Sequence, residues 1–159
     1  MGSFFLNDKI EEALVAIITQ TVPAAALAGV EVLPGKNPGI KSAPCVICFC
    51  DGDGEEDPRG SGNFWVDAGV GIKFYAVANP DGSGDEPDPK GANQALISAV
   101  FGAIWLSNLD ALLSAAVADL TVFPTSVIFQ AHSSGRDQDG AWIDELRFKC
   151  YCCASALPA

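Results

Sequence analysis

The sequence predicts an α+β fold, with an antiparallel or mixed β-sheet of about four main strands and two to three helices packed on one face. The closing segment 142–155 alternates apolar residues such as Leu146 and Phe148 with charged ones such as Arg147, and the segment 63–78 alternates in the same way. Stretches with helical periodicity lie before and between them. Since successive strand side chains point to opposite faces, each alternating segment indicates a strand with one buried side.

The N-terminal half predicts one helix and one or two strands. A helix is expected over 8–21, because Asp8 and Glu11 fit a capping box and apolar residues recur at helical spacing. A loop rich in Ala, Gly and Pro follows, with room for a short strand at 30–33. The nearly continuous apolar run 43–50 is typical of a strand that is covered on both faces or lies at a subunit contact.

The remaining elements follow in chain order. They are a strand at 63–78 that forms a long-tipped hairpin with 43–50, a helix starting at Asp88-Pro89, a shorter helix at 109–117, a strand at 121–131, a polar turn at 132–141 and the final strand pairing back.

Length and composition favour one domain spanning 1–159. The chain has 159 residues, 49% of them hydrophobic, which is enough to bury a core. No apolar run reaches the length of a membrane span, and the N-terminus lacks the pattern of a signal peptide. We therefore expect a soluble protein, made in a cytoplasm and without a membrane partner.

The charge is strongly acidic and unevenly distributed. The net charge of −11 argues against a nucleic-acid-binding surface, which needs clustered Lys and Arg. Two segments rich in Gly and Pro, 51–62 and 79–90, are predicted to be acidic loops. Their acids are Asp51, Asp53, Glu55, Glu56 and Asp57 in the first, and Asp81, Asp85, Glu86 and Asp88 in the second.

The six cysteines leave three interpretations open. Cys45, Cys48 and Cys50 belong to one predicted strand, and Cys150, Cys152 and Cys153 to another. They are buried thiols, or a cross-strand disulfide if the two strands are neighbours, or a metal site that uses the Cys45-x-x-Cys48 spacing.

Other polar motifs do not assemble a catalytic site. Residues 51–57 alternate carboxylates as a calcium loop does, but Glu56 stands where the EF-hand loop requires glycine, so a solvated hairpin tip is the simpler interpretation. The single histidine, His132, precedes two serines on a predicted turn, without the third group of a hydrolytic triad. We therefore predict no enzyme activity, no catalytic or metal-binding residue, and no cofactor.

Candidate contact residues come from two strands. Trp65 and Tyr75 fall on the strand face opposite the apolar stripe, where large aromatics either anchor an interface or remain partly exposed. Cys45, Val46 and Ile47 belong to the apolar run. The edges of that run and of the terminal strand are expected to be unpaired and available to another subunit.

Taken in order, these features resemble the tail-terminator (tail-completion, minor tail) proteins of long-tailed bacteriophages. The resemblance covers nearly the whole chain. It consists of the amphipathic helix 8–21, the Pro44-led apolar strand, an acidic loop, the long strand from Phe64-Trp65 to Phe74-Tyr75-Ala76, a helix, the Leu-Asp-Ala-Leu-Leu segment at 109–113, and an Asp-rich turn that leads into Trp142 and the terminal strand.

The resemblance implies a structural virion protein of the tail or neck, assembled in the host cytoplasm. Such a protein forms a six-fold ring that caps the tail tube, ends its polymerisation and contacts the head-side connector proteins. DNA would pass through without specific binding, and the acidic loops 51–62 and 79–90 would face the pore or a partner. The alternatives are another head–tail joining, neck or tail-tube protein, or, in a different class, a small metal- or ligand-binding module.

Overall fold

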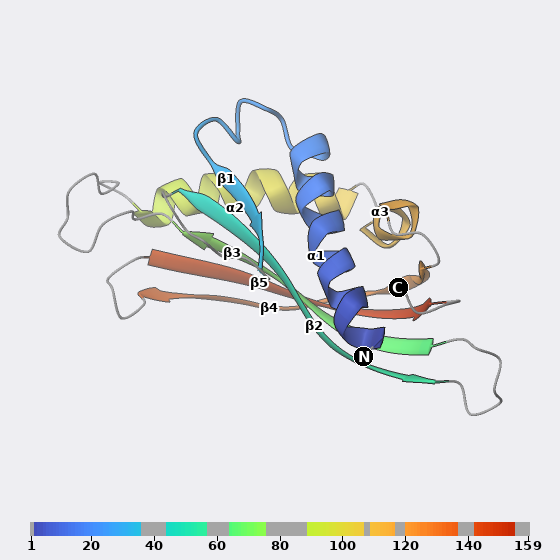
Figure 1. The fold of residues 1–159 in the computed structure, drawn as a ribbon. Coiled ribbons are helices and arrows are strands. Elements are labelled where there is room, and N and C mark those ends of the chain that lie inside the picture. Colours follow the sequence, from blue (N-terminus) through green and yellow to red (C-terminus); the bar gives the residue numbers. More distant parts are fainter. Residues whose placement is uncertain are drawn as a thin grey trace.

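The computed structural model describes residues 2–35, 44–56, 64–75, 89–106, 109–116, 120–136 and 142–154. Within these ranges the chain forms three helices and five strands (Figure 1). In chain order they are α1 (Gly2–Thr21), β1 (Glu31–Pro34), β2 (Cys45–Glu56), β3 (Phe64–Tyr75), α2 (Pro89–Leu106), α3 (Leu109–Ala116), β4 (Leu120–Arg136) and β5 (Trp142–Ala154).

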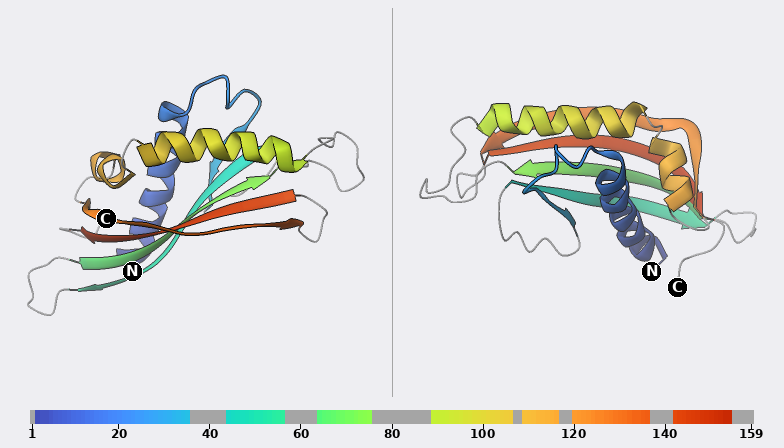
Figure 2. Two further views of the ribbon diagram at one scale, coloured as in Figure 1. Left: turned by 180° about the vertical axis from the view of Figure 1, so that it is seen from behind. Right: turned by 90° about the horizontal axis from the view of Figure 1, so that it is seen from above.

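The strands form one mixed, twisted sheet in the order β1-β2-β3-β5-β4. β1 runs parallel to β2, and every other pair of neighbours is antiparallel. All three helices lie on the same side of the sheet (Figures 1 and 2). The predicted α+β class and the helical layer on one face are confirmed. The sheet has five strands instead of four, because the short segment after α1 pairs with β2.

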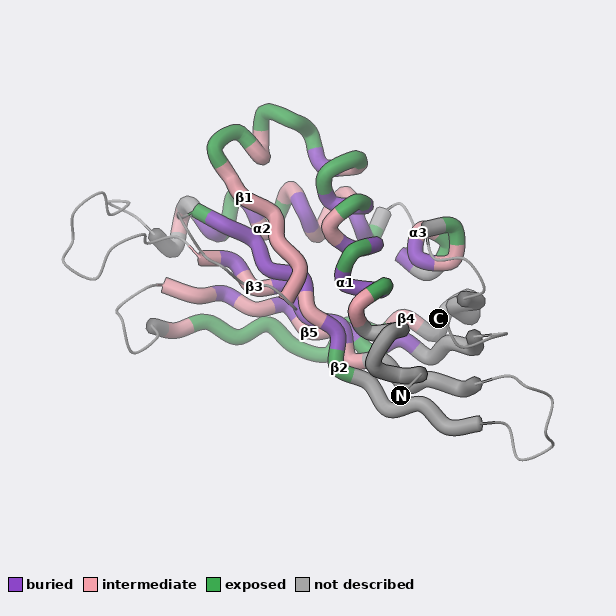
Figure 3. Tube along the Cα trace, viewed as in Figure 1, coloured by how far each residue is buried: buried purple, intermediate pink, exposed green. Residues whose placement is uncertain are grey.

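The core lies between the helices and one sheet face. Along β5, Leu146, Phe148 and Cys150 are buried and the residues between them are not, which confirms the predicted alternation. The same face of β3 buries Val70, Ile72 and Phe74 (Figure 3). The helices contribute the matching apolar residues. These are Ile10, Leu14, Ile17 and Ile18 of α1, Leu96, Val100 and Ile104 of α2, and Leu109 and Leu113 of α3.

The predicted start of the first helix is wrong. α1 begins at Gly2, so Asp8 lies within the helix and does not cap it. Glu11 is buried instead of completing a capping box. Its carboxylate Oε2 accepts a hydrogen bond from the backbone N–H of Cys50 at 3.1 Å. Glu11 thus joins α1 to β2 at a point beyond the last residue that pairs with β1.

Two predicted loops are partly strand. β2 continues through Asp51 to Glu56, because each of these residues has a partner in the N-terminal half of β3. His132 does not lie in a turn. β4 continues to Arg136, where it pairs with Trp142 at the start of β5. In both places the hairpin partner extends the strand into a polar sequence that periodicity alone assigns to loop.

The predicted free edges are also wrong. β2 lies between β1 and β3, and β5 lies between β3 and β4, so both are internal strands. The edge strands of the sheet are β1 and β4. The reason is that β5 pairs on both sides, with β3 as well as with its hairpin partner.

Candidate assembly surface

The edge strand β4 presents a long uncovered side. Within the described chain its backbone pairs with β5 alone. The register shifts between Val122 and Val127 and between Phe129 and Ala131, so the strand carries two irregularities. Figure 3 shows its stretch 128–134 as exposed. Because edge strands carry backbone groups without a strand partner, such a side is a template for association with another chain.

An aromatic cluster connects this edge to α2. Phe101 and Trp105 of α2 stack at 5.7 Å between ring centroids. Phe129 of β4 meets Phe101 edge-on at 5.6 Å, and Phe148 of β5 at the same distance. Phe148 is buried beneath the others, whereas Trp105 and Phe129 are 45% and 38% exposed. Their rings are thus held in place by packing while part of each faces outward, as interface anchors do.

The exposed stretch of β4 carries almost no charge. Residues 127–135 contain no Asp, Glu, Lys or Arg, and His132 is their only titratable side chain. Ile128, which points to the opposite sheet face from Phe129, is 57% exposed. In a chain of net charge −11, an uncharged surface is where like-charged copies can approach each other at least cost.

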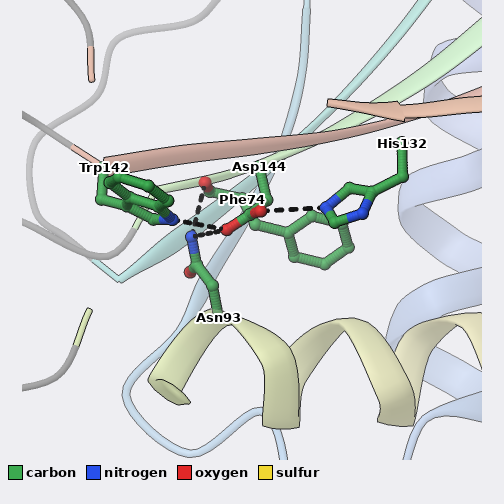
Figure 4. Close-up of polar contacts among 5 residues, drawn as sticks. All are labelled: Phe74, Asn93, His132, Trp142 and Asp144. Atoms are coloured by element: carbon green, nitrogen blue, oxygen red, sulfur yellow. Dashed lines mark hydrogen bonds and ion pairs between the residues drawn. The ribbon is translucent and has the colours of Figure 1, made fainter. Parts of the chain in front are cut away.

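A polar cluster around the buried Asp144 anchors the C-terminal half of β4. Asp144 of β5 points into the core face and is 5% exposed. Its Oδ2 accepts hydrogen bonds from Asn93 Nδ2 and Trp142 Nε1, each at 2.9 Å (Figure 4). Its Oδ1 lies 2.9 Å from His132 Nε2. Asn93 also donates to the carbonyl of Phe74 at 3.1 Å. This carboxylate therefore links α2, β3, β4 and β5 in one network.

A small apolar pocket lies beside the other edge strand, β1. Its volume is about 170 Å³. The described residues that line it come from the turn before β1, the start of β2 and the first half of α2: Ala26, Val30, Pro44, Asn93, Ala95 and Leu96. Its single polar side chain, Asn93, already donates to Asp144 and Phe74. The pocket thus suits an apolar group.

The sheet face without helices carries a second packed feature. The ring of Phe49 lies against Gly71 on the neighbouring strand, where a side chain would collide with it. Lys73 Nζ and Arg147 Cζ lie 5.2 and 5.1 Å from the ring centroid. Arg147 also pairs with Asp51 at 3.4 Å. These cation–π and ionic contacts order the centre of the open face, where Lys73 and Arg147 lie.

The strand order excludes the disulfide between β2 and β5, and the thiol positions argue against the metal site. β3 separates β2 from β5, which places their Cα atoms roughly 10 Å apart, beyond the span of a disulfide. Cys45, Cys48, Cys50 and Cys150 are buried and are not in disulfides. Cys45 and Cys48 point to opposite faces of β2, and burial raises the pKa of Cys48 to about 12 and that of Cys45 to about 11. Metal ligation needs thiolates on one side, so this pair is a poor metal site.

Of the predicted site residues, the structure pairs Cys45 with Tyr75 and Glu55 with Trp65 across β2 and β3. Cys45, Val46 and Ile47 are buried within the single chain. Tyr75 is half-buried at the end of β3, and Trp65 lies near its start, with a side chain outside the described part. Asp51 is exposed. The side chains of Asp53, Glu55 and Glu56 lie outside the described part, as do the whole residues Asp57, Asp81, Asp85, Glu86 and Asp88.

The sequence contains signals for the aromatic cluster, the uncharged stretch of β4 and the Asp144 network, none of which was predicted. Phe101 and Trp105 are four residues apart and therefore neighbours on one helix face. The uncharged stretch 127–135 stands out in an acidic chain. Asp144 continues the apolar stripe of Leu146 and Phe148, and a carboxylate in a core position indicates a buried hydrogen-bond network.

Comparison with known families and with curated proteins finds no match. No known family model matches the chain, and no curated protein is significantly similar to it. In the part of the chain that the structure describes, no helix is long and apolar enough to cross a membrane. In the same part, no three side chains of His, Cys, Asp or Glu are grouped so as to hold a metal ion.

Proposed function

We propose that this protein is a structural virion protein that associates into a six-fold ring, caps the tail tube of a long-tailed bacteriophage and joins it to the head-side connector. The observation that carries the proposal is the uncovered, uncharged edge of β4 beside the half-exposed rings of Trp105 and Phe129. A chain that buries its core yet leaves such an edge open has a surface suited to another subunit. The order of elements along the chain supports the same family of functions.

The acidic composition suits the proposed position in the particle. Each copy contributes a net charge of −11, so a ring would be strongly acidic. DNA phosphates passing through an acidic ring are repelled from its wall, which favours passage over adhesion. Ring formation must then rely on contacts that carry little charge, as the β4 surface does.

The test begins with the size of the purified protein. Light scattering measures the molar mass, and negative-stain imaging shows whether ring views are present. Particles of six chains of 16.5 kDa with a central hole are expected. Added to purified tail tubes, the protein should bind one end and stop further growth. A protein that neither forms rings nor binds tube ends contradicts the proposal.

The same tube experiment separates the nearest alternatives. A tail-tube subunit would lengthen the tube, and a head–tail joining protein would bind the connector but leave tube growth unchanged. Only a terminator both binds the tube end and sets the final tube length.

The apolar pocket beside β1 favours a second candidate function, a small-ligand-binding module. Its volume of about 170 Å³ suits a single small ring, since an apolar cavity of roughly 150 Å³ accommodates benzene. Native mass spectrometry of the protein purified from cells tests this candidate. A monomer that retains one small molecule per chain supports the module and contradicts the ring.

A further inference from the structure

The aromatic cluster and the apolar pocket lie at opposite edges of the sheet. Trp105 and Phe129 project beside β4, the last strand in the sheet order, and the pocket opens beside β1, the first. α2 contributes to both, with Ala95 and Leu96 at the pocket and Trp105 ten residues further along. Ten helical residues span about 15 Å, so one rigid element fixes the spacing between the two features.

The two features match in chemistry and size. The half-exposed rings are apolar, as are five of the six described pocket residues. The pocket volume of about 170 Å³ is close to that of cavities which hold one benzene ring. Neither the described pocket lining nor the 127–135 stretch of β4 contains an acidic side chain. Where these described residues meet, no carboxylate of one copy faces a carboxylate of the next.

We propose that the Trp105 ring of one copy, flanked by Phe129, docks into the pocket at Ala95 of the next copy. This contact rests on the proposed ring and names the surfaces that build it. Because the two surfaces are different and lie at opposite edges, the contact is head-to-tail. Repetition of a head-to-tail contact generates a closed ring or an open filament, whereas a contact between two identical surfaces stops at a dimer.

The contact can be tested with two variants, one that removes the aromatic ring and one that fills the pocket. Trp105→Ala removes the ring but keeps the pocket, and Ala95→Trp fills the pocket but keeps the ring. Each variant alone should be monomeric at concentrations where the wild type assembles. The protein concentration needed for assembly should rise at least about 30-fold, as expected when an anchor residue is lost. In an equimolar mixture, Trp105 of the second variant still fits the pocket of the first. We expect sedimentation velocity to show species of two chains that grow no further.

Control variants separate a lost contact from a lost fold. Phe129→Thr weakens the same aromatic surface while it keeps a residue that favours strands, and it should act like Trp105→Ala. Gln20→Ala changes an exposed, uncharged residue of α1 outside both surfaces and should leave assembly unchanged. Circular dichroism and urea unfolding establish that each variant is folded before its assembly is scored.

Several outcomes overturn the inference. If the wild type forms rings and both single variants do so too, the rings use other surfaces, and the proposed function stands without this contact. If Ala95→Trp still dimerises alone and mixing adds nothing, the aromatic surfaces meet each other and the pocket is not involved. If the wild type is monomeric at all concentrations and in the presence of tail tubes, both the contact and the ring are wrong.

Discussion

At the scale of single residues, Asp144 has three side-chain partners to lose. Its carboxylate accepts from Asn93 and Trp142 and lies within hydrogen-bond distance of His132, at a nearly fully buried position. Asp144→Ala leaves the Asn93 and Trp142 donors without this acceptor, and we expect the free energy of unfolding to fall by about 2–4 kcal/mol. Urea unfolding measures the loss. Glu145→Ala, on the opposite face, should cost less than about 1 kcal/mol, and equal effects of the two variants would contradict the assigned role.

The buried thiol of Cys48 makes stability dependent on alkaline pH. Desolvation, with the nearby Glu11 carboxylate as a second cause, raises its pKa from 9.0 to about 12. Because the folded-state pKa is the higher one, this contribution to stability is complete below pH 9 and is lost as the pH rises from 9 toward 12. At pH 10 the loss amounts to about 1.4 kcal/mol.

Comparison with Cys48→Ala isolates this single group, since other titrations affect both proteins alike. Under reducing conditions, the difference in unfolding free energy between wild type and variant should narrow by about 1.4 kcal/mol from pH 8 to pH 10. A difference that stays constant over this range would show that the thiol ionises as readily in the folded chain as in the unfolded one.

At the scale of elements, α1 contacts the β2 edge just beyond the last residue that pairs with β1. β1 pairs with β2 only as far as Cys48, and the Glu11 carboxylate accepts the backbone N–H of Cys50 just beyond. Glu11→Ala removes this acceptor and should cost about 1–3 kcal/mol, with faster hydrogen exchange at the Cys50 amide. Glu12→Ala, at the next and exposed position, is the matched control. Unchanged exchange at Cys50 in Glu11→Ala would refute this role.

The packing of Phe49 on Gly71 couples β2 to β3. A methyl group at Gly71 would meet the ring, so Gly71→Ala must displace it from Lys73 and Arg147. We expect a cost of about 1 kcal/mol in the wild-type background and a smaller or absent cost in Phe49→Ala. A double-mutant cycle by urea unfolding measures this coupling, and additive effects of the two substitutions would show that the ring is not held by Gly71.

The elements themselves were largely predictable, whereas their neighbours in the sheet were not. Alternation identified β3 and β5 because each buries one face, and the periodicity of Ile10, Leu14 and Ile17 identified α1. Pairing across hairpins determines where β2 and β4 end, so polar residues such as Asp51 and His132 were assigned to loops. Periodicity is a local signal, and strand order depends on contacts that are distant in sequence. The edge position of β4, and with it the candidate surface, therefore could not be read from the pattern.

At the scale of the whole molecule, net charge and the uncharged β4 surface act in opposite directions on assembly. Copies of charge −11 repel one another at long range, while the aromatic contact is short-range and indifferent to salt. Raising NaCl from about 20 mM to about 500 mM shortens the screening length from roughly 20 Å to roughly 4 Å. We therefore expect assembly of the wild type to strengthen at least about tenfold in sedimentation velocity, because repulsion falls and the contact remains.

Trp105→Ala provides the matched control for this salt effect. It has the same net charge as the wild type but lacks the aromatic ring, so screening alone should not assemble it. An interface built from ion pairs between copies would respond with the opposite sign, because salt weakens attraction between unlike charges. Dissociation of wild-type assemblies at high salt would therefore contradict a contact at β4. It would instead assign the contact to the charged open face around Lys73 and Arg147, where cations of one copy could meet the acids of another.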